Sequence, residues 1–278
     1  MSLYLLPVVF TLFLWWFSTG VILYLNGLPQ RTFKWTLLGA TAVLLLALYG
    51  LAASRNDTSV AGAYCGFTCA LMVWAWQEVA FLLGYVTGPR RVPCAANSTG
   101  WRRFVQAFQA MAHHELALVV LAVAVFLATY DGSNLTGWWT YLVLWVMRQS
   151  AKLNVFLGVR NLNEGFLPPH LKYIDSYFRR QPMNLLFPFA ITVSTALAAL
   201  VWQAALAPGL SAFAATSLSF VATLLTLAIL EHWFMVLPLP FEALWKWGLR
   251  SRQASPPAHA PAADAQRLAS LRAAPLAD

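Results

Sequence analysis

The sequence predicts an all-α protein, a polytopic integral membrane helical bundle of about seven transmembrane helices. Three observations support this fold class. Of the 278 residues, 60% are hydrophobic and only 10% are charged, whereas a typical soluble domain carries roughly 25% charged residues. Apolar runs of membrane-spanning length recur along the chain, and Lys and Arg collect in alternate loops.

Seven runs reach the roughly 20 apolar residues that a membrane span needs. They cover residues 3–25, 34–53, 59–87, 104–130, 136–158, 185–208 and 211–237. Most are hydrophobic on all sides and lack the alternation of a barrel strand, which favours helices. The first run has neither a basic start nor a small-residue cleavage site, so we expect it to remain as a span rather than be removed as a signal peptide.

The basic residues predict the orientation. The loops after the first, third, fifth and seventh runs contain Lys and Arg, whereas the opposite loops hold only Arg55. Because cytoplasmic loops are enriched in Lys and Arg, we expect the N-terminus outside and the C-terminus in the cytoplasm. The positive charges are too dispersed to form a nucleic-acid-binding face, so we expect a lipid bilayer and no nucleic acid among the partners.

The chain is expected to form one domain with a tail. Residues 1–250 carry all seven runs and predict a single transmembrane helical domain. Residues 251–278 are rich in Ala, Pro and Ser with scattered Arg. Such a composition buries too little apolar surface to become ordered, which predicts a disordered cytoplasmic tail.

Eight ionisable residues lie inside these spans, where such groups are costly and mark a candidate functional site. This predicted intramembrane polar cluster consists of Glu78, His113, His114, Glu115, Arg148, Lys152, Glu231 and His232. The predicted topology places all of them within roughly 15 Å of the cytoplasmic boundary. Three carboxylates face two basic side chains, which leaves one negative charge for a protonated group, a bound cation or a cationic ligand to neutralise.

Several interpretations of the cluster stay open. A salt-bridge network would fix helix packing, as polar groups in membrane bundles often do. A single histidine would suffice as the axial ligand of a tetrapyrrole in an apolar pocket, and His114 is the candidate. A carboxylate could instead exchange protons with a bound substrate. No catalytic residue can be assigned from the sequence.

A metal site is a further interpretation, since Glu and His are suitable ligands for iron or zinc. The metal candidates are Glu78, His114, Glu115, Glu231 and His232. Adjacent side chains on a helix point about 100° apart, so neither His-Glu group presents two ligands on one face. Nearby basic side chains would also repel a divalent ion, and we predict no bound metal.

The loop after the fifth run predicts a short interfacial helix. Two prolines at 168 and 169 suit a helix start, and Leu171, Ile174 and Phe178 form an apolar stripe. Such a helix would lie on the lipid headgroups or dock a partner.

Six separated stretches within residues 3–250 resemble one known family. They are FLWWFSTG at 13–20, TGPRR at 87–91, HHEL at 113–116, SAKLNVFLG at 150–158, FRRQPMN at 178–184 and EHWF at 231–234. In these residues the chain resembles PuhE, the photosynthetic complex assembly protein family of purple phototrophic bacteria. Genes of this family sit beside the gene for the reaction-centre H subunit.

The resemblance implies a membrane assembly factor for the photosynthetic reaction centre and its light-harvesting complex. It implies bacteriochlorophyll or a precursor as the candidate cofactor, and reaction-centre subunits, light-harvesting subunits or pigment-biosynthesis enzymes as partners. The implied location is the bacterial inner membrane, either cytoplasmic or intracytoplasmic. The alternative is a membrane enzyme, or enzyme subunit, of bacteriochlorophyll biosynthesis with a Glu/His site in the inner half of the bundle; the non-enzymatic role is favoured.

Overall fold

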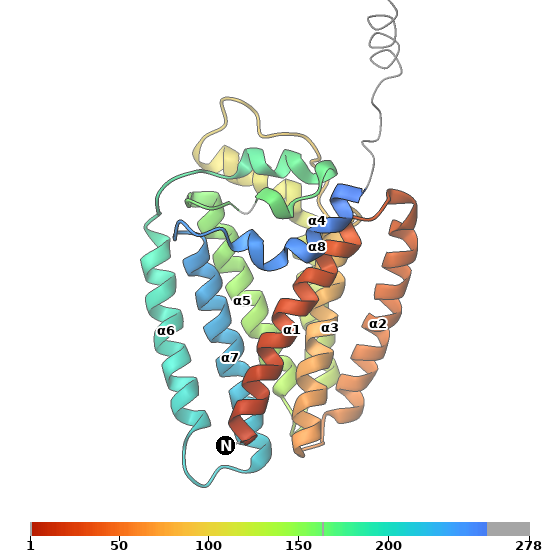
Figure 1. Cartoon of the computed structure of the whole chain (residues 1–278), viewed down its shortest axis with the longest axis vertical. Helices are drawn as coiled ribbons and strands as arrows, with labels where there is room; N and C mark the ends of the chain where they lie inside the picture. The colour runs from red at the N-terminus through yellow and green to blue at the C-terminus, as the bar shows by residue number, and fades with distance from the viewer. Residues whose placement is uncertain (1, 163, 255–278) are drawn as a thin grey trace, which may run out of the picture.

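The computed structural model describes residues 2–162 and 164–254, and this part of the chain is helical (Figure 1). Its elements are α1 (Ser2–Asn26), η1 (Gln30–Thr32), α2 (Phe33–Ser54), α3 (Val60–Leu82), α4 (Gly100–Thr129), α5 (Thr136–Leu157), η2 (Glu164–Phe166), η3 (Pro169–Tyr177), α6 (Leu186–Ala205), α7 (Ala212–Phe234), η4 (Phe241–Trp245) and α8 (Lys246–Ala254). The all-α fold class predicted from the sequence is therefore confirmed.

Six of the described helices are long and apolar enough to cross a membrane: α1, α2, α3, α4, α6 and α7. Helix α5 has 22 residues, equivalent to roughly 33 Å, and runs beside the others in the bundle (Figure 1). It packs against α3, α4 and α7. Its C-terminal half carries Arg148, Gln149, Lys152 and Asn154, which makes it less apolar than its neighbours.

The third predicted span ends earlier than the sequence suggested. Helix α3 stops at Leu82, five residues short of the expected end, because Gly84 adopts a left-handed φ of 83°. The Tyr85 N–H donates to the carbonyl of Ala80, closing the helix with the pattern that a glycine terminator favours. Glu78 consequently lies in the last two turns of α3.

Helices α3 and α7 form the centre of the bundle, and α2 and α6 form its edges (Figure 1). The rings of Phe67 and Phe220 stack between α3 and α7 with centroids 4.2 Å apart. By contrast, Leu46 on α2 and Phe189 on α6 are largely exposed. Large apolar side chains on the outside are the arrangement that a lipid environment requires.

The end of the bundle that holds most basic residues is covered by η3. The sequence predicted a short helix with an apolar stripe of Leu171, Ile174 and Phe178. The segment is a 3-10 helix that ends at Tyr177, and Phe178, just beyond it, packs with the rest of the stripe. The buried residues of the 3-10 helix are Leu171, Ile174 and Tyr177, spaced by the three residues of one 3-10 turn. They pack towards Phe81 at the end of α3, so this face of the segment lies on protein.

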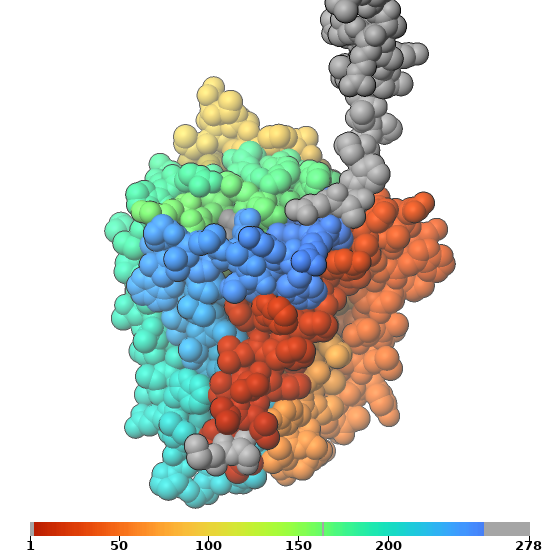
Figure 2. All heavy atoms as spheres, viewed as in Figure 1, coloured from red at the N-terminus to blue at the C-terminus, as the bar shows by residue number. Residues whose placement is uncertain are grey.

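The residues after α7 cross the same end of the bundle as a strap, which we define as residues 236–254. Figure 2 shows them as a continuous blue band over the upper end of α1. The indole N–H of Trp245 donates to the carbonyl of Trp16, and that of Trp16 donates back to the carbonyl of Leu244. Helix α8 extends to Ala254, four residues beyond the expected domain boundary. The rest of the predicted disordered tail lies outside the described residues.

Candidate functional site

A cavity of about 400 Å³ lies between α1, α3, α4, α5 and α7, and residues of η3 and η4 also line it. This volume falls in the range of roughly 300 to 1,000 Å³ typical of small-molecule sites. Most of the lining is apolar and aromatic. Four of its lining residues are charged, namely Glu78, Arg148, Lys152 and Glu231, and all four belong to the predicted polar cluster.

Glu78 and Arg148 form an ion pair between α3 and α5. Arg148 Nη2 donates to Glu78 Oε2 over 3.0 Å. The carboxylate side chain is 14% exposed and the guanidinium side chain 41%, and both residues line the cavity. Much of the arginine therefore faces the interior space while one nitrogen remains bound to the acid.

Glu115 ties α4 to α5 through two donors on α5. Lys152 Nζ lies 2.7 Å from Glu115 Oε1, and Gln149 Nε2 lies 2.8 Å from Glu115 Oε2. The lysine and glutamate side chains are 17% and 21% exposed. Lys152 thus reaches the cavity with its charge already compensated by a carboxylate behind it.

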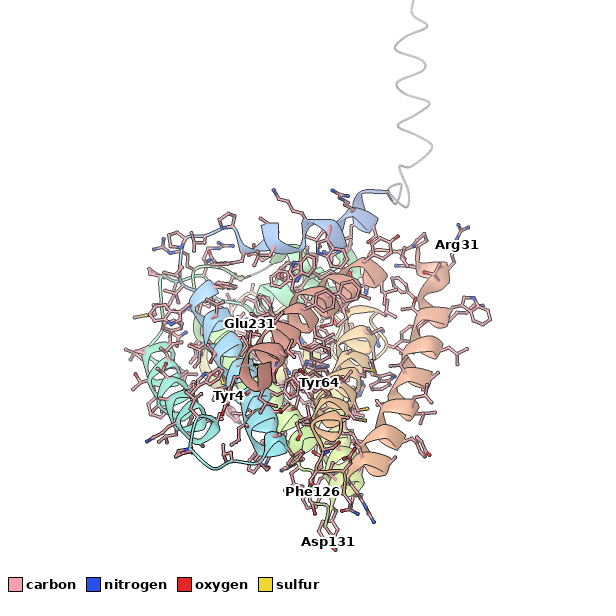
Figure 3. All side chains as sticks on the ribbon, turned by 60° about the horizontal axis from the view of Figure 1, so that its bottom comes forward. Tyr4, Arg31, Tyr64, Phe126, Asp131 and Glu231 are labelled. Atoms are coloured by element: carbon pink, nitrogen blue, oxygen red, sulfur yellow. The ribbon has the colours of Figure 1, made fainter. Side chains whose placement is uncertain are left out.

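Glu231 lies in the last turn of α7, where Figure 3 labels it, and it is one of the residues that line the cavity. Its Oε1 accepts a hydrogen bond of 2.6 Å from the indole N–H of Trp15 on α1. None of the ion pairs formed by the described residues includes Glu231. Its side chain is exposed, and the residue is among those that line the cavity.

The three histidines of the predicted cluster have separate environments. His232 Nδ1 donates to the carbonyl of Ala228 at 2.8 Å, so Nε2 accepts from Ser150 Oγ at 2.8 Å. His114 is fully buried, and its ring packs on Phe81 with centroids 4.5 Å apart. His113 is exposed. None of the three is among the residues that line the cavity.

The structure therefore gathers five of the eight predicted residues, the three glutamates with Arg148 and Lys152, into one connected region. The three histidines lie outside this region. His232 is hydrogen-bonded to Ser150 on α5, His114 packs on the ring of Phe81, and His113 is exposed. Within the described residues, no group of three His, Cys, Asp or Glu side chains comes together as a metal site.

Sequence reasoning missed three side-chain partners of the cluster, Trp15, Gln149 and Ser150. All three are uncharged, so an inventory of ionisable residues passes over them. A usable signal was available, because an indole N–H or a side-chain amide within a membrane span needs a hydrogen-bond partner.

The fold and the cavity define a helical membrane protein with a space for a small molecule inside its bundle. The chain belongs to the DUF3623 family, described as a protein of unknown function, which it matches over residues 1–256. It is also 39% identical over 247 residues to an "Uncharacterized 30.4 kDa protein in puhA 5'region" of Rhodobacter capsulatus, covering 87% of this chain and 89% of that relative. No solved structure matches the chain.

Proposed function

We propose that this protein is a PuhE-type assembly factor for the photosynthetic reaction centre and light-harvesting complex, and that its cavity holds bacteriochlorophyll or a precursor. The printed name of the Rhodobacter capsulatus relative refers to the puhA 5' region, which supports a role in photosynthesis. The single observation that carries the pigment-handling part is the cavity of about 400 Å³ lined by Trp15, Trp74 and Trp245. Flat aromatic side chains suit the faces of a macrocycle.

The proposal includes seven membrane spans, the six long apolar helices and α5, which is less apolar than the others. Arg148 and Lys152 on α5 are bonded to Glu78 and Glu115, and polar groups satisfied within the bundle are tolerated in a span. The loops at the end covered by η3 carry most of the Lys and Arg residues, while the opposite loops contain Arg55. This asymmetry supports a cytoplasmic location for the covered end in the bacterial inner membrane. The same basic end is the surface proposed to dock reaction-centre subunits, light-harvesting subunits or pigment-biosynthesis enzymes.

A bound pigment would supply a macrocycle whose central magnesium would need a ligand from the protein. His114 remains the proposed ligand from the sequence, but Phe81 both lines the cavity and packs on the His114 ring. Phe81 would have to rotate before His114 could reach a macrocycle in the cavity. Glu231 faces the cavity directly, and carboxylate oxygen is a suitable ligand for magnesium.

The test is the absorption spectrum of the protein purified in mild detergent from a phototrophic host, from the near-ultraviolet to the near-infrared. We expect a stoichiometric tetrapyrrole band that His114→Ala or Glu231→Gln weakens. Glu164→Gln is the matched control, because Glu164 pairs with Arg180 outside the cavity. A spectrum without a pigment band would contradict the pigment-handling part of the proposal.

The alternative proposal is a membrane enzyme or enzyme subunit of tetrapyrrole biosynthesis. It is favoured by Glu231, a carboxylate that faces the cavity without an ion-pair partner among the described residues and could exchange a proton with a bound substrate. In this case Glu231→Gln should leave the protein at normal levels while a biosynthetic intermediate accumulates. The assembly factor instead predicts fewer reaction centres with unaltered pigment chemistry. Quantifying pigments and reaction centres in the same mutant distinguishes the two.

A further inference from the structure

The charged side chains around the cavity carry an uncompensated negative charge. Glu78 is paired with Arg148, and Glu115 is paired with Lys152. Glu231 is the remaining carboxylate of the group, and no ion pair formed by residues 2–162 and 164–254 includes it. Both cationic groups that reach the cavity are paired with other acids, Arg148 through Nη2 and Lys152 through Nζ.

The surroundings of Glu231 make this charge unfavourable. Its hydrogen bond within the described part of the chain comes from Trp15 and occupies Oε1, and the residue lines the cavity. Phe234 and Trp245 are among the neighbouring lining residues. A carboxylate that faces a mostly apolar cavity is stabilised by further donors or a cation beyond one indole N–H. The position therefore suits a ligand that brings a donor.

The rest of the cavity specifies the other end of that ligand. The lining towards α3, α4 and η3 includes Phe67, Phe81, Ala110 and Ile174. These side chains offer no hydrogen bonds, so a ligand that fills this region gains free energy mainly by burying apolar surface. The two ends together call for an amphiphilic molecule.

We propose that the cavity selects an amphiphile whose head group donates hydrogen bonds to Glu231, an ammonium group being the strongest such donor, and disfavours the same molecule with a carboxylate head group. An anionic head would add a further negative charge beside Glu231, in a group where three carboxylates already face only two basic side chains, both of them paired. This inference rests on the proposed function in one respect, that the cavity is a ligand site. It adds the chemistry of the head group that the site prefers.

The test is native mass spectrometry of the full chain, released from mild detergent after equilibration with dodecylamine or with dodecanoate. The two probes share one tail and differ in the charge of the head. We expect one saturable dodecylamine adduct per chain and an affinity at least tenfold weaker for dodecanoate. Equal affinities, or adducts that increase without saturation for both probes, would overturn the proposal.

Two variants connect this selectivity to the carboxylate. Glu231→Gln keeps the side-chain size and an acceptor for Trp15 but removes the charge, so the preference for the amine should fall to less than threefold. Glu164→Gln is the same substitution outside the cavity and should leave the preference unchanged. A Glu231→Gln protein that melts like the wild type and keeps the full preference would refute the role of Glu231.

A third variant keeps the test valid if Glu231→Gln does not fold. Trp15→Phe removes the indole donor from Oε1 and leaves the carboxylate in greater need of another donor. Amine binding should therefore be retained or strengthened, whereas damage to the cavity would weaken amine and acid binding together. Loss of the amine preference in a folded Trp15→Phe protein would count against the proposal.

The probes also separate this inference from the proposed pigment. Saturable amine binding by a protein that shows no tetrapyrrole band would refute pigment handling and support the head-group rule. The opposite result is a tetrapyrrole band in the purified protein together with equal affinities for the two probes after the pigment has been removed. That result would support pigment handling and refute the head-group rule.

Discussion

The ion pair between Lys152 and Glu115 should be a main tie between α4 and α5. Lys152→Met removes the cation, keeps most of the apolar stem and leaves Glu115 with Gln149 as its donor. The pair is largely buried, with side chains 17% and 21% exposed. Breaking a buried pair by removing one partner costs about 3 to 5 kcal/mol, because it leaves an uncompensated charge. The remaining amide donor places the expected loss near the lower end, at about 3 kcal/mol.

The structure contains a control pair with the same separation. Arg180 Nη2 lies 2.7 Å from Glu164 Oε1, as Lys152 Nζ does from Glu115 Oε1, but its side chains are 62% and 40% exposed. Exposed pairs contribute about 0 to 1 kcal/mol. Distance is thus held constant while burial changes.

The assay is a double-mutant cycle on each pair, with the free energy of unfolding measured by SDS titration in mixed micelles. One cycle uses Lys152→Met, Glu115→Gln and their combination, and the other uses Arg180→Met, Glu164→Gln and their combination. We expect a coupling energy of about 2 kcal/mol or more for the buried pair and below about 1 kcal/mol for the exposed pair. Equal coupling in the two cycles would refute the reasoning that burial makes the Lys152 pair important.

Three further predictions concern the strap, the covered end and the topology. A Cβ at Gly20 would overlap the indole of Trp247, whereas one at Gly39 meets nothing within 4 Å; Gly20→Ala should therefore lower stability by about 1 to 3 kcal/mol and expose the strap to protease, while Gly39→Ala is neutral or stabilising by up to ~1 kcal/mol. Equal protease sensitivity would contradict this. Burial lowers the pKa of His170, although its hydrogen bond to the carbonyl of Leu82 opposes the shift. Because the unfolded chain then binds the proton more readily, stability should be lost as the pH falls below about 6.5, and His170→Gln should lose less; identical pH dependence of the melting temperature in the two proteins would exclude His170 as the cause. A C-terminal green fluorescent protein fusion should fluoresce and an alkaline phosphatase fusion should be inactive if the covered end is cytoplasmic; the opposite pair of results would reverse the orientation.

Several features could be predicted from the sequence because they depend on local chemistry. Long apolar runs with few charges predict membrane helices wherever they occur along the chain, and the runs around 34–53 and 185–208 correspond closely to α2 and α6. The cost of charge in a membrane span likewise singled out Glu78, Arg148 and Glu231, which line the cavity.

Where the sequence misjudged an element, a contact or a single backbone angle was responsible. The apolar run through residue 87 continues past Leu82, but the left-handed φ of Gly84 ends α3 there. The η3 segment is a 3-10 helix that ends at Tyr177, so Phe178 lies just beyond it, although Phe178 still packs with Leu171 and Ile174. Neither outcome follows from hydropathy. Hydropathy does not report the φ angle of a single glycine, and it does not distinguish the two helical periods over a segment as short as η3.

The sequence by itself determined a helical membrane protein with three acids and two bases at one depth of its bundle. Only the tertiary structure decided how these charges pair and that the indole of Trp15 on α1 donates a hydrogen bond to Glu231 on α7. It also decided that His113 is exposed while His114 is buried against Phe81. The physical reason is that hydropathy is a property of each segment, whereas ion pairing depends on which helices are neighbours and how each is rotated about its axis. Those two quantities are set by packing across the whole bundle.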